Sequence, residues 1–424
     1  MKKHALQIFR AALDAADPQH AVLRHLQSDG RVLIAGKQRY SLTDIDRVFV
    51  VGAGKASAGM ASAVERLLGR RITDGLVNVP DGVTARVRRT QLHAARHPLP
   101  DERGIAGAHK IAELAHQATV RDLVIALISG GASALLPAPV PGLALEQKQS
   151  ITKALMNGGA TIHELNAVRK HLSTIKGGQL AALAYPARII SLIFSDVIGD
   201  DLDVIGSGPT VGDRATCAQS RAILDKYGVD LALELLHETP KPNDDRLKRT
   251  QNLIIGSNRL AIDAAAVRAR ELGYKPLVLS TMIEGETREI ANMHAAIVKE
   301  ILANNRPAKR PVCILSGGET TCTVRGSGSG GRNQEFVLAS AIALQGAKDI
   351  EIFSGGTDGL DGPTDAAGAT ADGDTVARAA ALGMDARAFL NDNDSYHFFA
   401  PINGLVKTGP TGTNVMDVRA ILIR

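Results

Sequence analysis

The chain has 424 residues, of which 45% are hydrophobic, so at about 150 residues per domain we expect two globular domains. Its 42 glycines and 3% aromatic residues predict many tight turns around small aliphatic cores and argue against an aromatic surface for nucleic acids. The net charge of +5 comes from Lys and Arg scattered among acidic residues, which also argues against nucleic-acid binding. The composition therefore indicates an α/β enzyme.

Cysteine usage and hydropathy predict a cytoplasmic protein without a membrane partner. The 3 cysteines include no C-x-x-C pair and are odd in number, which suits a reduced compartment better than a disulfide framework. Polar and charged residues interrupt the first 14 positions, which predict an amphipathic surface helix rather than a signal peptide. The longest aliphatic run, 123–128, is far shorter than the roughly 20 residues that span a bilayer.

Short aliphatic runs alternate with helical patterns along the chain. The runs do not alternate with polar residues, so we expect parallel strands that are buried on both faces. They occur at 48–51, 123–128, 189–194, 253–255, 276–279, 312–315 and 350–353. Segments of helical period lie between them, at 56–68, 103–118, 259–271 and 287–303. This order predicts a doubly wound α/β fold.

One segment has the composition of an interdomain linker. Residues 237–250 combine prolines with dense charge and lack an apolar period. We therefore place a domain boundary near residue 240, which gives a Rossmann-like domain at 1–240 and a second α/β domain at 241–424.

Glycine-rich turns follow most of the predicted strands. Ligands bind outside the carboxyl ends of strands in open α/β sheets, where glycine lets backbone amides approach an anion. Several such loops also carry Ser or Thr, which together favour a phosphate or carboxylate site. The residues expected to contact phosphate or nucleotide are Gly52, Gly54, Ser129, Gly130, Gly131, Ser133, Gly317 and Gly318.

The first loop discriminates between classes of nucleotide. Gly52, Gly54, Lys55 and Gly59 form G-x-G-K-x-x-x-G, which matches neither the Walker pattern nor the dinucleotide fingerprint. Asp81 lies near a possible strand end, so a dinucleotide stays open. A lysine in the phosphate turn favours a triphosphate or a carboxylate instead.

Phosphoryl transfer would need fixed cations and metal ligands in addition to helix termini. The chain offers Lys55 and also Arg332, which follows a flexible G-S-G-S-G-G loop and precedes a helical pattern. Acidic residues beside the glycine loops are the candidate metal ligands, and they are Asp196, Asp200 and Glu319.

A helix with a basic face is predicted from 163 onward, and it ends at a pair of glycines. Arg169 and Lys176 in this segment, with Asn333 beside Arg332, are the candidate substrate-binding residues. The two histidines of the segment lack the spacing of a zinc helix, and no G-x-S-x-G elbow is present, so hydrolase chemistry is not expected.

A set of motifs extends from residue 50 to residue 417. They are V-V-G-A-G-K-A, H-P-L-P-D-E-R-G, S-G-G-A-S-A-L-L, L-N-A-V-R-K-H-L-S-T-I-K-G-G, S-D-V-I-G-D-D, I-G-S-G-P-T, S-G-G-E-T-T, G-G-R-N-Q-E, G-T-D-G-L-D-G-P-T-D-A-A-G-A, N-D-S-Y and G-P-T-G-T-N-V-M-D. Together they resemble the type II glycerate kinase family, which has a Rossmann-like domain and a MOFRL domain. The MOFRL segment would cover about 310–420.

The resemblance implies phosphorylation of D-glycerate to 2-phosphoglycerate, with ATP and Mg²⁺, in a cleft between the two domains. It implies that Lys55 and Arg332 are the catalytic residues and that Mg²⁺ is held by some of Asp196, Asp200 and Glu319. Members are also called hydroxypyruvate reductases, so an NAD(P)H-dependent reductase is the alternative. A non-catalytic sensor of hydroxy acids would use the same loops but would not need as many carboxylates. The sequence leaves the oligomeric state open, a homodimer being one option.

Overall fold

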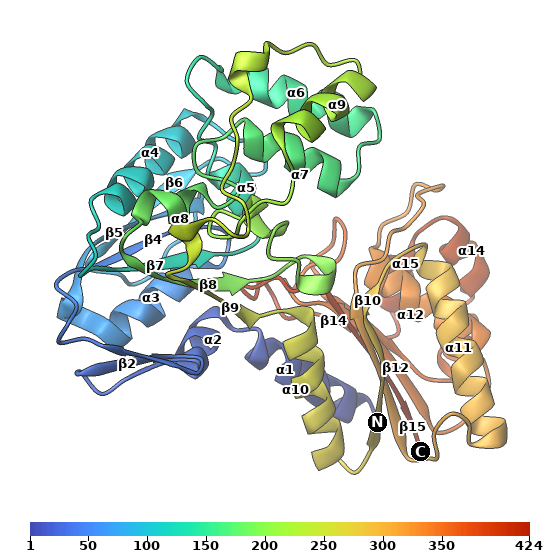
Figure 1. The fold of residues 1–424 in the computed structure, drawn as a ribbon. Coiled ribbons are helices and arrows are strands. Elements are labelled where there is room, and N and C mark those ends of the chain that lie inside the picture. Colours follow the sequence, from blue (N-terminus) through green and yellow to red (C-terminus); the bar gives the residue numbers. More distant parts are fainter. The chain divides into compact units, whose positions relative to one another are not determined.

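The computed structural model describes residues 1–424, which separate into two compact units (Figure 1). The N-terminal unit is Pro18–Ile255, and the C-terminal unit combines Met1–Asp17 with Gly256–Arg424. All three cysteines are free. None of the helices has both the length and the apolar character needed to cross a membrane.

The division between the units differs from the boundary predicted near residue 240. Residues 250–256 form strand β9 (Thr250–Gly256), which belongs to the sheet of the N-terminal unit. Helix α1 (Lys2–Ala15) packs against α10 (Asn258–Glu271) and β15 (Asp417–Ile423), so the first residues of the chain belong to the C-terminal unit. Both arrangements depend on contacts between distant segments, which the composition of a linker does not reveal.

The N-terminal unit is built on a six-stranded sheet in the order β6-β5-β4-β7-β8-β9. The neighbouring strands from β6 to β8 are parallel. This order places the first strand, β4, in the middle, so the chain winds outward in both directions from the boundary between β4 and β7. The strands not yet delimited are β4 (Val48–Ala53), β5 (Ile72–Pro80), β6 (Thr90–Ala95), β7 (Leu123–Ile128) and β8 (Arg188–Phe194).

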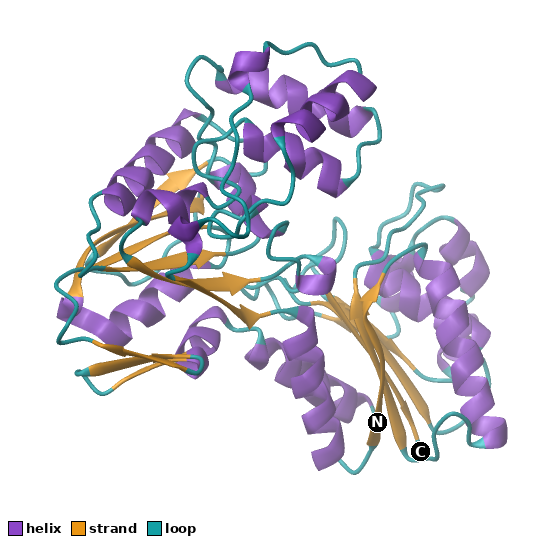
Figure 2. Cartoon of the chain, in the orientation of Figure 1, coloured by secondary structure: helices purple, strands orange, loops and turns teal.

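Helices cover both faces of this sheet, with α4 and α8 on one side and α3 on the other (Figures 1 and 2). The helices of the unit are α2 (Pro18–His25), α3 (Ser57–Leu68), α4 (Glu102–His116), α5 (Ala132–Leu135), α6 (Leu145–Asn157), α7 (Ile162–His171), α8 (Gln179–Ala184) and α9 (Cys217–Lys226). Short 3-10 helices are η1 (Gly69–Arg71), η2 (Ile198–Asp200), η3 (Ile205–Ser207), η4 (Leu233–Leu235) and η5 (Asp245–Leu247). A small antiparallel sheet contains β1 (Leu26–Ser28), β2 (Val32–Ala35) and β3 (Gln38–Ser41).

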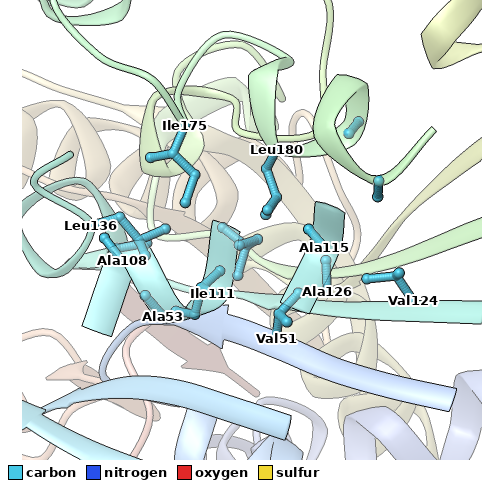
Figure 3. Packing of buried hydrophobic residues seen from close by; sticks show 14 of the residues in the cluster. Val51, Ala53, Ala108, Ile111, Ala115, Val124, Ala126, Leu136, Ile175 and Leu180 are labelled. Atoms are coloured by element: carbon cyan, nitrogen blue, oxygen red, sulfur yellow. The ribbon is translucent and has the colours of Figure 1, made fainter. Parts of the chain in front are cut away.

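Small aliphatic side chains form the core between the sheet and helices α4 and α8 (Figure 3). Val51 of β4 and Val124 of β7 point toward Ile111 of α4 and Leu180 of α8, and all four are buried. A separate cluster joins α6, α7 and α9 through Leu155, Val168 and Leu224, among others. These two cores fix the ends of β4 and β7 and the basic helix α7.

The C-terminal unit contains a mixed sheet in the order β10-β11-β15-β12-β13-β14. Only β10 and β11 pair in parallel, because β15 runs antiparallel between β11 and β12. Its strands and helices not yet delimited are β10 (Lys275–Ile283), α11 (Thr287–Asn304), β11 (Val312–Gly318), α12 (Arg332–Ala343), β12 (Ile350–Gly356), β13 (Gly368–Ala371), α13 (Thr375–Ala380), α14 (Ala386–Asn391), α15 (Ser395–Phe399) and β14 (Leu405–Val406). The predicted runs at 276–279, 312–315 and 350–353 are strands, but this sheet is not the uniformly parallel one that they suggested.

Candidate active site

Two of the predicted glycine loops meet where β4 and β7 end side by side. The backbone N–H of Lys55 donates to the carbonyl of Gly130 over 2.9 Å, and the N–H of Ser129 donates to the carbonyl of Ala53 over 3.1 Å. The N–H of Ala56 donates to the Ser129 hydroxyl over 3.1 Å. This is the point at which the strand order reverses, and ligands bind there in open α/β sheets.

The close approach of the loops requires glycine in two places. A Cβ on Gly52 would lie only 2.1 Å from the Leu127 carbonyl oxygen, and a Cβ on Gly54 would lie 2.0 Å from the Ser129 hydroxyl oxygen. Gly54 also has a φ of +138°, which L side chains rarely adopt. The two glycines therefore let the β4 loop pack directly on the β7 loop and place Lys55 at the start of α3.

Charged and polar side chains gather around the β7 turn. A Cβ on Gly131 would lie 2.9 Å from His97 Nε2 and 3.5 Å from Lys55 Cγ, and a Cβ on Gly130 would overlap the Asp196 carboxylate. Burial lowers the pKa of His97, and the charge of Lys55 lowers that pKa further. Burial raises the pKa of Asp196, and its backbone hydrogen bond and Lys55 offset only part of that rise. Lys55 itself is exposed and makes no ion pair, so its charge is available to an anion.

The predicted metal ligands belong to different units. Asp196 lies beside the β7 turn, and Asp200 ends η2 with a φ of +57°. Glu319 belongs to the C-terminal unit. A different group, His171, Cys217 and Glu238, has its possible ligand atoms within 4.8 Å of one another, and metal binding by the predicted acids stays a prediction.

A hydrogen-bonded chain connects the β7 loop to α7. The hydroxyls of Ser133 and Ser207 are 2.8 Å apart, and Ser207 Oγ donates to Asn166 Oδ1 over 3.0 Å. Lys176 Nζ donates to the Ser133 carbonyl over 2.7 Å. The structure thus brings the predicted residues Ser133 and Lys176 together. Arg169, the other basic residue expected to bind substrate, lies on α7, which also carries Asn166.

Arg332 is held by two carboxylates of the C-terminal unit. Its Nε and Nη2 donate to the two oxygens of Asp417 over 2.7 and 3.0 Å, and its Nη1 lies 3.0 Å from Glu319 Oε1. Burial alone would lower the pKa of Arg332, but Asp417 and then Glu319 reverse this and raise that pKa above its usual value. These ion pairs hold the Arg332 guanidinium in place, so it is not free to move on a flexible loop. Asp417 is fully buried, whereas Glu319 is 46% exposed and can be displaced more easily.

A carboxylate already occupies the N-terminus of α12. Asp361 accepts hydrogen bonds from the backbone N–H groups of Asn333 and Gln334 over 3.0 and 2.8 Å. The Asn333 side chain donates to both Asp361 and Asp417 and accepts from the Ser354 hydroxyl over 2.5 Å. The buried Asn333 amide is thus engaged within the protein, and its role in substrate binding stays a prediction.

The glycine pair after the predicted strand at 312–315 lies inside β11. Gly317 and Gly318 pair with Val418 and Asp417 of β15. A Cβ on Gly317 would overlap the amide of Asn258, whose Nδ2 donates to the carbonyl of Asp417 over 2.8 Å. Close packing accounts for these glycines, and their contact with phosphate remains untested.

Comparison with known proteins identifies the family. Residues 4–237 match a family described as a domain of unknown function (DUF4147), and residues 312–417 match the MOFRL family. The chain is 39% identical to a D-glycerate 2-kinase of Thermotoga maritima, with 99% of this chain and 97% of the relative covered. A crystal structure of glycerate kinase from Thermotoga maritima superposes with a TM-score of 0.92 at 39% identity, covering 100% of this chain and 99% of that one. The chain belongs to the glycerate kinase family.

Membership confirms the family resemblance, the two-domain α/β fold and the enzyme class of a phosphotransferase. One further relative, from Agrobacterium vitis, has the provisional name hydroxypyruvate reductase. It is 43% identical to this glycerate kinase family member, with 98% of this chain and 93% of the relative covered.

Three residues of these sites are not among the predicted site residues. His97 and Asp417 lie in motifs of the glycerate kinase family, but nothing local shows that His97 lies beside the β7 turn or that Asp417 binds Arg332. In the sequence, Asp361 looks like a residue of an Asp-Gly turn. In the structure it caps α12, although it follows Asn333 by 28 residues in the chain. The signal that could have indicated Asp417 is an acid in front of an otherwise aliphatic run.

Proposed function

We propose that this chain transfers the γ-phosphoryl group of ATP to the 2-hydroxyl of D-glycerate, with Mg²⁺, in the cytoplasm. The observation that carries the proposal is the unpaired Lys55 at the start of α3, on a turn formed by two packed glycine loops. In the transfer, the glycerate oxygen forms a bond to the γ-phosphorus, the bond from that phosphorus to the β–γ bridging oxygen breaks so that ADP leaves, and the hydroxyl proton is released to the solvent. Positioned positive charge is what such a transition state requires.

The residues of the β4 and β7 loops would hold the phosphates. Lys55 and the N-terminus of α3 would stabilise the charge on the transferred group, and the backbone of Gly130 and Gly131 would approach the phosphate oxygens. Asp196 fits a Mg²⁺ ligand, because a cation would offset the burial that raises its pKa. When bound, Mg²⁺ neutralises charge on the phosphates.

Arg332 would contribute from the C-terminal unit. Its Nη1 contacts the half-exposed Glu319, an ion pair that water weakens. A substrate carboxylate or phosphoryl group could replace Glu319 there, while Asp417 keeps the guanidinium in place through Nε and Nη2.

The reductase alternative has one supporting observation, the strand order, which dinucleotide-binding folds share. Asp81 directly follows β5, where an acid would bind the ribose of the dinucleotide. Both of its oxygens, however, accept hydrogen bonds from Arg103, over 2.7 and 2.9 Å. Because Arg103 already binds Asp81 and a lysine lies in the phosphate turn, the kinase is the better supported function.

One assay separates the possible functions. The purified protein with D-glycerate, ATP and Mg²⁺ is expected to release ADP in proportion to the glycerate consumed. Oxidation of NADH in the presence of hydroxypyruvate, without ADP release from glycerate, would identify a reductase and refute the proposal. Turnover in neither mixture would point to a sensor.

A further inference from the structure

Three basic side chains of the N-terminal unit, two of them buried and one partly buried, have no acidic partner. Lys148 of α6 is 6% exposed and Lys176 is 1% exposed, while Arg169 of α7 is partly buried and forms no ion pair. Lys148 Nζ donates to the carbonyl of Leu172 over 2.6 Å, and Lys176 Nζ donates to the carbonyl and hydroxyl of Ser133 over 2.7 and 3.2 Å. Every polar contact of the two lysines is thus with a neutral oxygen.

The neighbouring Lys170 is also buried, but carboxylates of the protein neutralise its charge. It lies on the same helix as Arg169, and its ammonium contacts the carboxylates of both Asp203 and Asp213. Burying a charge is unfavourable unless it is paired, so this arrangement is the expected one for a structural cation. Lys148, Arg169 and Lys176 depart from it.

The three cations also act on one another. Burial lowers the pKa of Lys148 to about 7, with Arg169 adding to the effect, and burial lowers the pKa of Arg169 to about 10. Burial lowers the pKa of Lys176 far below its usual value, and Arg169 and Lys148 lower it further. No carboxylate raises these pKa values again. A bound anion would supply the negative charge that stabilises the three protonated side chains.

We infer that Lys148, Arg169 and Lys176 form the subsite that binds the carboxylate of the hydroxy-acid substrate. The inference rests on the proposed function for the identity of that acid. A planar guanidinium and two ammonium groups match the two oxygens of a carboxylate. Lys176 bonds Ser133, only a few residues beyond the β7 turn where Lys55 lies. A short acid held here by its carboxylate would therefore keep its hydroxyl close to the phosphate loops.

Lys148 is the residue to test, because no motif of the sequence singled it out and its one side-chain hydrogen bond is to the Leu172 carbonyl. Lys148→Met keeps the length of the side chain but removes its charge. Lys153→Met is the matched control, since Lys153 is an exposed lysine on the same helix. Two quantities are measured for each full-length protein: the rise in Tm with added D-glycerate, glycerol, inorganic phosphate or ATP, and the KM for each substrate.

Lys148→Met is expected to lose most of the Tm rise that D-glycerate produces and to raise the glycerate KM at least about tenfold, because a charge-assisted hydrogen bond is lost. The KM for ATP should stay the same, glycerol should give no Tm rise in any variant, and Lys153→Met should behave as the wild type.

An unchanged response to D-glycerate in Lys148→Met would overturn the inference. Loss of the response to phosphate or ATP, with the response to glycerate retained, would overturn the assignment to a carboxylate. If the wild type turned over no glycerate but D-glycerate still raised its Tm through Lys148, the proposed kinase function would fail and the carboxylate subsite would stand. A general loss of stability in Lys148→Met without any change in the ligand responses would mean a structural role only.

Discussion

Lys55 and Arg332 were both predicted as catalytic cations, and their surroundings differ. Lys55 is exposed and unpaired, as expected from its place after a glycine turn. Arg332 is bound by Asp417, 85 residues later in the chain. The sequence could predict both residue types and their loops. It could not predict the ion pair, because that pair exists only where β15 runs beside β11 and α12 begins.

The ion pair makes a double substitution informative. Arg332→Ala is expected to lower kcat at least about a hundredfold through lost charge stabilisation. It should also lower the free energy of unfolding by about 3 kcal/mol, because buried Asp417 loses its main partner. Adding Asp417→Asn should restore most of the stability without restoring turnover. Kinetics and denaturant unfolding of both variants check this, and recovery of turnover in the double variant would show that Arg332 acts only in folding.

At the scale of elements, the sequence predicted the strands better than their partners. The runs at 48–51 and 123–128 correspond to β4 and β7, and the glycine turns after them meet as expected. In the C-terminal unit, β15 separates β11 from β12 and pairs with both, which no local pattern reveals. The glycines that end those two runs are therefore paired strand residues rather than an open loop.

The three glycines of the first loop look alike in the sequence but have different neighbours. Gly52 faces the Leu127 carbonyl, so Gly52→Ala must displace the backbone of β4 or β7 and is expected to cost about 1–3 kcal/mol or more. Gly59 lies in α3, where a Cβ would have ordinary contacts, the nearest at 3.4 Å with Pro18.

Gly59→Ala is therefore the control for Gly52→Ala. It should leave stability unchanged or raise it by up to about 1 kcal/mol, because alanine favours the helix. Denaturant unfolding of the two variants compares them directly. Equal stability would contradict the close packing of the two loops.

At the scale of the whole molecule, the chain order of the units was the least predictable feature. The sequence indicated two α/β domains correctly, but α1 belongs with residues 256–424 because its apolar face packs on α10 and β15. Such a contact joins opposite ends of the chain. A search for linkers along the sequence can only divide it into consecutive pieces.

The stability of the C-terminal unit should depend on pH through His294. This side chain is buried, with hydrogen bonds of 2.8 Å to the Ile290 carbonyl and the Ser316 hydroxyl. Burial lowers its pKa to about 4, although the hydrogen bond to Ile290 opposes this. Because the unfolded chain binds the proton first, near pH 6.5, the contribution of His294 is present above that pH and is lost as the pH falls toward 4.

Between pH 7 and pH 5 this loss amounts to about 2 kcal/mol. Asp361, whose pKa burial raises to about 6, acts in the opposite direction over the same range, so the wild type must be compared with a variant. In His294→Gln the free energy of unfolding should fall by about 2 kcal/mol less than in the wild type on acidification. Parallel pH profiles of the two proteins would contradict the assignment.

Transfer of labelled γ-phosphoryl from ATP to D-glycerate depends most directly on the turn that joins β4 to α3. We expect the wild type and Lys37→Ala, which removes an exposed lysine of the same unit, to form labelled phosphoglycerate at equal rates. Lys55→Ala should fold normally and form it at least about a hundredfold more slowly, because the charge that stabilises the transferred group is gone. A folded Lys55→Ala protein that transfers the label at the wild-type rate would contradict this assignment.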